Sequence, residues 1–104
     1  MNNKINYMDE MKALFKAANE KDGIQAAERA SAAIDRLNDL YTKVCAANLG
    51  IGKKIPEKEL IDAVQELNAC GEKYIGKKYC ESTTDIKEVK KFMNEFLQSL
   101  YSHR

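Results

Sequence analysis

Residues 24–49 read IQAAERASAAIDRLNDLYTKVCAANL, and neither Gly nor Pro interrupts them. Apolar side chains recur along this stretch every three or four positions, with polar side chains between them: Ala27, Ala30, Ile34, Leu37, Tyr41 and Val44. That spacing is typical of an amphipathic helix. A helix over 24–49 would be roughly 37 Å long, at about 1.5 Å per residue, and would be the longest element of the domain.

The segment before this helix predicts a second, shorter helix packed against it. Apolar side chains again recur at helical spacing over residues 5–21, and Asp22-Gly23 then supplies a break that suits a helix C-terminus. A turn this short forces the two helices to run antiparallel. Small side chains on both predict a close approach at Ala13, Ala17 and Ala18 on one side and Ala26, Ala27, Ala30, Ala32 and Ala33 on the other.

Two further helices are predicted after the long one. Residues 50–55 contain two glycines and form a loop, and Pro56 is placed at the first position of a helix over 56–75 that ends before Gly76. A capping region at 82–85, in which Ser82 with Asp85 or Asp85 with Glu88 satisfies the first N–H groups, precedes a helix over 84–101. Its inward face carries most of the predicted aromatic core: Ile86, Val89, Phe92, Met93, Phe96, Leu97 and Leu100.

Four amphipathic helices joined by short connections predict an all-α fold, an antiparallel four-helix bundle formed by a single domain over 1–104. The composition agrees, because 44% of the residues are hydrophobic and the chain of 104 residues holds only one Pro and five Gly. No stretch alternates with the period of two that a strand requires. The helices also show no internal repeat of the solenoid type.

The charge balance narrows the classes of partner. The chain carries 17 Lys and Arg against 16 Asp and Glu. Because proteins that bind nucleic acid or membrane surfaces normally carry a basic excess, this balance favours another protein as the partner. No run approaches the roughly 18 apolar residues of a membrane span, and the N-terminus lacks the pattern of a secretory signal. We therefore expect a soluble cytoplasmic protein whose three cysteines are free thiols.

The sequence contains no catalytic motif, and we expect neither a metal nor a cofactor. Cys45, Cys70 and Cys80 are too widely spaced for a zinc site, and the one histidine is His103, next to the last residue. Cys80 follows Lys77 and Lys78, whose positive charge would favour a thiolate. A small enzyme or ligand-binding bundle that uses Cys80 is therefore one alternative.

Two pairs of lysines are the candidate partner-binding residues. Lys53 and Lys54 lie in the loop after the long helix, and Lys77 and Lys78 lie in the loop before the last one. Tyr79 follows the second pair, and we expect it to be an exposed aromatic contact. A second alternative is a helical protein that uses these lysines to bind nucleic acid. A long helix that extends past its neighbours could also pair two copies as a homodimer.

Residues 34–71 resemble the small cytosolic immunity proteins of bacteriocin producers in the order of their segments. A helix rich in Leu and Tyr is followed by a short basic loop and then by a helix that opens with Pro56 and Glu57. This resemblance is one of architecture, and it implies an antiparallel four-helix bundle. The function we predict is a small non-enzymatic protein-interaction module, of the adaptor, inhibitor or immunity type. It would bind through a helix face or through the loop at 77–80.

Overall fold

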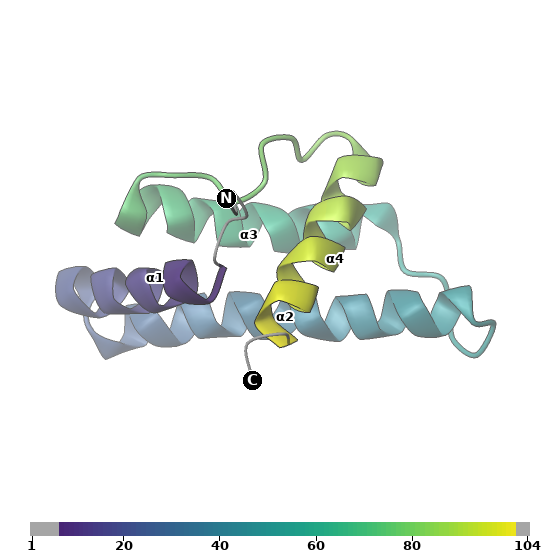
Figure 1. The fold of residues 1–104 in the computed structure, drawn as a ribbon, viewed down its shortest axis with the longest axis horizontal. Helices are drawn as coiled ribbons and strands as arrows, with labels where there is room; N and C mark the ends of the chain where they lie inside the picture. The colour runs from purple at the N-terminus through teal and green to yellow at the C-terminus, as the bar shows by residue number, and fades with distance from the viewer. Residues whose placement is uncertain (1–6, 102–104) are drawn as a thin grey trace, which may run out of the picture.

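The computed structural model describes residues 7–101, which form an all-α bundle of four helices. They are α1 (Tyr7–Asp22), α2 (Ile24–Asn48), α3 (Glu57–Ile75) and α4 (Ile86–Tyr101). The predicted fold class is confirmed. Helices α1, α2 and α3 lie lengthwise beside one another, whereas α4 crosses steeply over α3 and α2 (Figure 1). The predicted first helix began at 5, and residues 5 and 6 lie outside the described part of the chain.

Apart from the start of α1, which is not tested, the predicted helix boundaries are correct to within two residues, and the differences have local causes. Gly23 and Gly76 adopt positive φ values of 88° and 71°, which is why α1 and α3 end where they do. Pro56 is extended, with φ −58° and ψ 137°, so it caps α3 rather than being its first helical residue. Asp85 caps α4, because its side-chain oxygen accepts the N–H of Lys87 at 3.0 Å, and the helix therefore begins at Ile86.

The crossing helix α4 contributes two of the four buried aromatic side chains among the described residues, and Tyr74 of α3 and Tyr79 of the loop supply the others, so the prediction that α4 carries most of the aromatic core is wrong. The Phe92 and Phe96 rings pack with centroids 5.4 Å apart, and both side chains are buried. Their buried neighbours on the same helix are Val89, Met93 and Leu97. Ile86 at the start of the helix is half-buried, and the side chain of Leu100 lies outside those that the structure describes.

Alanines bring α1 and α2 together, although not all of those predicted. Four of them are fully buried between the helices: Ala18, Ala26, Ala30 and Ala33. Ala17 and Ala27 are half-buried, but Ala13 and Ala32 are exposed. Ala13 precedes the buried Leu14 by one position and Ala32 precedes Ala33, and each is rotated by about 100° from its neighbour, which turns both to solvent.

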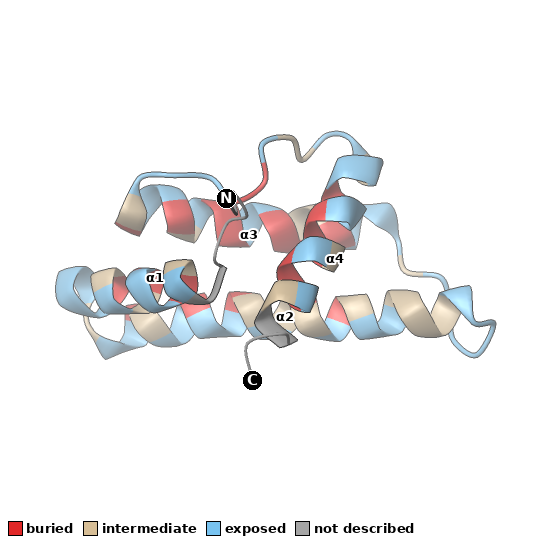
Figure 2. Cartoon of the chain, viewed as in Figure 1, coloured by how far each residue is buried: buried red, intermediate tan, exposed pale blue. Residues whose placement is uncertain are grey.

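Helix α2 is longer than its partners, and the far part of it is poorly covered. It has 25 residues against 16 in α1, so α1 reaches only its first half (Figure 1). Helix α4 crosses near its middle, and beyond that point residues 44–47 are only half-buried (Figure 2). The molecule therefore has two unlike ends. No helix in the described part of the chain combines the length and apolarity needed to cross a bilayer.

Candidate functional site

The end of the bundle where α1, α3 and the loop over 76–85 meet is held by side-chain contacts, and we call it the closed end. The Tyr74 hydroxyl donates to Asp22 Oδ2 at 2.7 Å, and Lys73 Nζ lies 3.1 Å from the same oxygen. Lys21 Nζ donates to the Tyr74 carbonyl at 3.1 Å. The hydrogen bonds from Tyr74 and Lys73 hold the pKa of Asp22 below its usual value.

One buried side chain, Asn68, holds the loop at the closed end against α3. Its Oδ1 accepts the backbone N–H groups of Tyr79 and Cys80, each at 3.0 Å. Its Nδ2 donates to the Cys80 carbonyl at 2.9 Å. Asn68 is only 7% exposed, so these three bonds form out of water, where an unpaired polar group is costly. Residues 79 and 80 of the loop are thus fixed to the core, whereas 76–78 and 81 on either side of them are exposed.

Tyr79 is not the exposed aromatic contact that the sequence predicts. It is 8% exposed, and its ring lies directly against Gly71 of α3. A Cβ on Gly71 would come within 2.8 Å of that ring and 2.5 Å of the Lys77 carbonyl, so only glycine permits this packing. The Tyr79 hydroxyl is buried without a hydrogen-bond partner among the described residues, and burial raises its pKa. The prediction of exposure is therefore wrong.

The lysines of the same loop are paired with carboxylates. Lys77 forms an ion pair with Glu10 of α1, and Lys78 Nζ lies 3.5 Å from a carboxylate oxygen of Glu72. Neither pair was predicted, and the first could not be, because the sequence does not show that α1 passes beside this loop. The structure also does not bring the five predicted binding residues together, because Lys53 and Lys54 lie at the other end of α3.

Cys80 is a buried thiol, and its surroundings do not support the alternative in which the neighbouring lysines lower its pKa. Its side chain is 5% exposed, and its Sγ donates to the Ser82 carbonyl at 3.2 Å. Burial raises the pKa of this thiol. The described residues also contain no group of three or more His, Cys, Asp or Glu side chains placed to share a metal ion. His103 lies outside the described residues.

The opposite end, which we call the open end, comprises residues 41–60 and the part of α4 that faces them. Helix α2 finishes there with Gly50 at φ 78° and two backbone bonds, Gly50 N–H to Ala47 O and Ile51 N–H to Ala46 O, each 3.0 Å. This is the Schellman arrangement of helix ends. It fixes the backbone of Leu49 and Ile51, yet their side chains are 75% and 78% exposed.

A pocket of about 220 Å³ adjoins these residues, between α2, α3 and α4. Its walls are apolar: Val44, Cys45, Leu60 and Met93. Its polar lining residues are Tyr41, Asn48, Lys90 and Asn94. The Tyr41 hydroxyl donates to Asn94 Oδ1 at 2.6 Å and so links α2 to α4 across the pocket. The adjoining Cys45 side chain, and then burial, raise the pKa of Tyr41.

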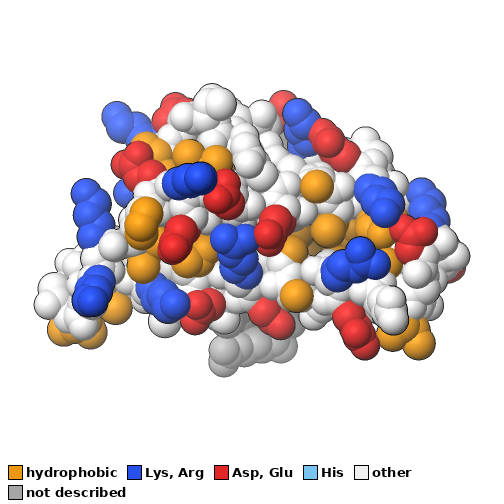
Figure 3. Space-filling view, turned by 180° about the vertical axis from the view of Figure 1, so that it is seen from behind, with side chains coloured by type: hydrophobic (Ala, Val, Ile, Leu, Met, Phe, Trp, Pro, Cys, Tyr) orange, Lys and Arg blue, Asp and Glu red, His pale blue; other side chains and the backbone are white. Residues whose placement is uncertain are grey.

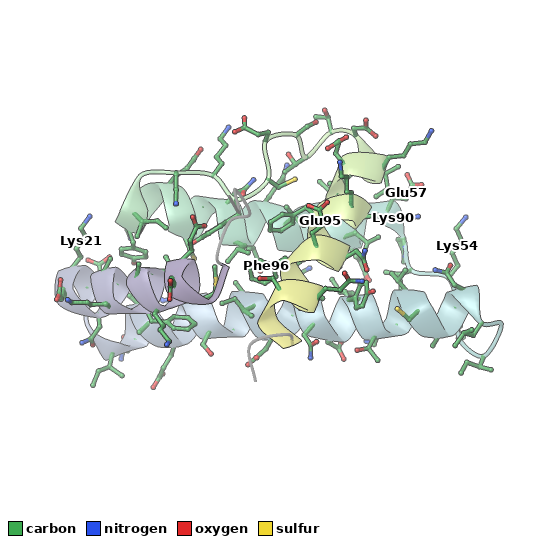
Figure 4. The ribbon with its side chains drawn as sticks, in the orientation of Figure 1. Lys21, Lys54, Glu57, Lys90, Glu95 and Phe96 are labelled. Carbon is green, nitrogen blue, oxygen red and sulfur yellow. The ribbon has the colours of Figure 1, made fainter. Side chains whose placement is uncertain are left out.

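The open end is the basic part of an otherwise slightly acidic chain. Residues 41–60 and 86–94 contain seven Lys and three Glu, and the rest of the chain has ten basic and thirteen acidic side chains. Among the described residues, no carboxylate pairs with Lys53, Lys54 or Lys90. Lys54, Lys90 and Glu57 lie toward this end, opposite Lys21 (Figure 4). Seen from behind, most of the surface mixes both signs of charge (Figure 3).

Sequence reasoning found Lys53 and Lys54 but missed the apolar surface beside them. Two features of the sequence could have indicated this surface. The predicted second helix is longer than the first, and Leu49 and Ile51 stand on either side of Gly50. Comparisons with known protein families, with curated proteins and with solved structures found no match to this chain. The architectural likeness to immunity proteins therefore stays a prediction.

Proposed function

We propose that this chain is a non-enzymatic protein-interaction module that binds its partner with the open end. The observation that carries the proposal is the exposure of Leu49 and Ile51 on a backbone fixed by hydrogen bonds. Burying a Leu or Ile side chain contributes roughly 1.5–3 kcal/mol. Because the backbone beneath these two is already ordered, less conformational entropy is lost when a partner covers them.

The remaining features support the open end over the closed one. At the closed end the loop is hydrogen-bonded to Asn68, and its lysines are paired with Glu10 and Glu72. These polar groups therefore already have partners within the chain. The open end joins apolar groups to lysines that lack a carboxylate partner among the described residues. Such a surface suits an adaptor, an inhibitor or an immunity-type protein, all of which work by covering a partner. We place the module in the cytoplasm, because its three cysteines are all unpaired.

The test compares what three forms of the protein capture from a lysate of the native cells. The first is the unchanged chain, and the second carries Leu49→Ser together with Ile51→Ser. The third carries Ile24→Ser, a matched control, because Ile24 is also exposed, at 70%, but lies at the other end of α2. All three substitutions change exposed side chains, so each form should keep the helical circular dichroism of the unchanged protein.

We expect one protein that is captured by the unchanged chain and by Ile24→Ser and is lost from the double variant. The proposal is contradicted if all three forms capture the same proteins, because the open end would then not be the contact. Light scattering of the purified chain across a range of concentrations tests the homodimer. Self-association that the double variant abolishes would make the second copy the partner and would contradict an adaptor role.

A further inference from the structure

We propose that the pocket beside Leu49 accepts one bulky apolar side chain from an acidic segment of the partner protein. This inference rests on the proposed function and specifies the chemistry of the partner. It follows from four properties of the open end, namely the pocket's size, its walls, its position and the charge around it.

The volume fits one side chain better than a free ligand. A cavity of about 150 Å³ lined by apolar groups accommodates benzene, whereas sites for cofactors and other small molecules occupy about 300–1,000 Å³. The pocket here, at about 220 Å³, lies between these values. A Leu, Phe or Trp side chain matches it, with the rest of the partner segment lying outside.

The walls select an apolar group. Leu60 and Met93 are 1% and 2% exposed and belong to the core, and Val44 is half-buried above them. Among the polar lining residues, Tyr41 and Asn94 already satisfy each other. A polar side chain that entered would lose its water and gain few partners. Met93 also offers a polarizable sulfur that favours aromatic rings.

The pocket is lined by the last turns of α2, directly before the exposed Leu49. Cys45 lines the pocket, and Leu49 follows it by four positions on α2, so the two residues lie on the same side of the helix. The N–H of Leu49 donates to the Cys45 carbonyl at 3.1 Å, which fixes their relative positions. A segment that inserts a side chain into the pocket therefore also covers Leu49.

The charge selects an acidic segment. Lys90 lines the pocket and no carboxylate does, and Lys53 and Lys54 lie on the adjoining linker. Figure 4 labels two opposing charges, Glu57 toward this end and Glu95 on α4, and Lys58 follows Glu57 directly in the chain. Because complementary charge speeds encounter and disfavours partners of the same sign, Asp and Glu beside the inserted side chain would be selected.

The test uses three synthetic peptides that separate the apolar group from the charge. They are Ac-Glu-Glu-Trp-Glu-Glu-NH2, its Lys-Lys-Trp-Lys-Lys counterpart, and the Glu-Glu-Ala-Glu-Glu form without the aromatic ring. The readout is the NMR signal of the Met93 methyl group, assigned with Met93→Leu. We expect the acidic Trp peptide to shift this signal with a several-fold lower Kd than the basic Trp peptide. The Ala peptide should leave the signal unmoved.

Two variants localise the binding. Cys45→Phe fills the pocket and should abolish the response, whereas Lys90→Glu should weaken the acidic peptide several-fold. Lys16→Glu is the control for charge, because Lys16 is exposed on α1, away from the pocket. Circular dichroism and thermal unfolding show which variants fold. If Cys45→Phe does not fold, Lys90→Glu decides alone, since its side chain is exposed.

Three results overturn the inference. They are equal affinity for the acidic and basic Trp peptides, binding of the Ala peptide, or no shift with any peptide. The inference is also overturned if the Met93 methyl signal shifts with protein concentration when no peptide is present, because a second copy of the chain would then fill the pocket. The proposed function fails separately. A natural partner that is retained by Cys45→Phe but lost with Leu49→Ser and Ile51→Ser contradicts the pocket and leaves the interaction module intact.

Discussion

At the closed end Asn68 makes three buried hydrogen bonds to the loop that follows α3, whereas at the open end Leu49 and Ile51 point their side chains into solvent. Helices α2 and α3 run through both ends, and the ends differ in what covers these two helices (Figure 1). The cause is length, because α1 covers only the first half of α2. The comparison indicates that buried polar contacts hold the closed end, whereas two of the three large hydrophobic side chains exposed among the described residues lie at the open end.

That division predicts where substitutions should matter. At the closed end the Asn68 hydrogen bonds and the Gly71–Tyr79 contact are buried, whereas the ion pairs are largely exposed, so the large effects are expected at the buried positions. At the open end the exposed side chains already contact water, and their loss should cost little in the unbound protein. Unfolding measurements on matched pairs of variants, one from each end, test this directly.

The largest effect is expected for Asn68→Ala. The change leaves two backbone N–H groups and one carbonyl of residues 79 and 80 without partners in a buried place, which should cost about 3 kcal/mol of unfolding free energy. Asn48→Ala, at the exposed last residue of α2, is the matched control and should change stability by less than about 0.5 kcal/mol. Urea denaturation followed by circular dichroism measures both. Similar values for the two would contradict the comparison.

Gly71→Ala should have the next largest effect. A methyl group here meets the Tyr79 ring and the Lys77 carbonyl, and the cost of overpacking, about 1–3 kcal/mol, exceeds the gain of about 1 kcal/mol from replacing a helical glycine. Gly52→Ala at the open end is the control, because its Cβ would lie 3.2 Å from Ala46 Cβ and the linker can adjust. We expect thermal unfolding to show a lower Tm for the first variant only. A stabilised Gly71→Ala would mean that the loop does not pack as described.

The helices could be predicted from the sequence, but the difference between the ends could not. Helical periodicity and the glycines at 23 and 76 are local signals, and they placed each boundary other than the start of α1 within two residues. The burial of Tyr79 depends on Gly71 and Asn68, eight and eleven positions away. Loops take their conformation from such distant contacts, so no pattern within 77–80 reveals it. The exposure of Leu49 likewise depends on where α1 ends against α2.

Thiol labelling compares the two ends within one unmodified molecule. Cys80 at the closed end is buried, donates to the Ser82 carbonyl and has a raised pKa, whereas Cys45 at the open end is half-buried in the pocket wall. Because the thiolate is the reacting form, Cys80 should react with a maleimide several-fold more slowly than Cys45 at neutral pH. Mass spectrometry of peptides from timed samples gives both rates. Faster labelling of Cys80 would show that the loop opens and would restore the hypothesis of a reactive cysteine.

The smallest effect concerns Asp22, whose pKa is held below its ordinary value near 3.8 by hydrogen bonds from Tyr74 and Lys73. A lowered pKa in the folded state contributes stability above the unfolded value, and this contribution disappears as the pH falls through the folded value. Asp22→Asn should therefore have a lower unfolding free energy than the unchanged chain at pH 7. This difference between the two proteins should disappear as the pH falls below about 3.8. Asp39→Asn is the control, because Asp39 pairs only with Lys43 one turn away on the surface of α2. A gap for Asp22→Asn that stays constant from pH 7 to pH 2 would show that its carboxylate does not hold α1 to α3 through charge.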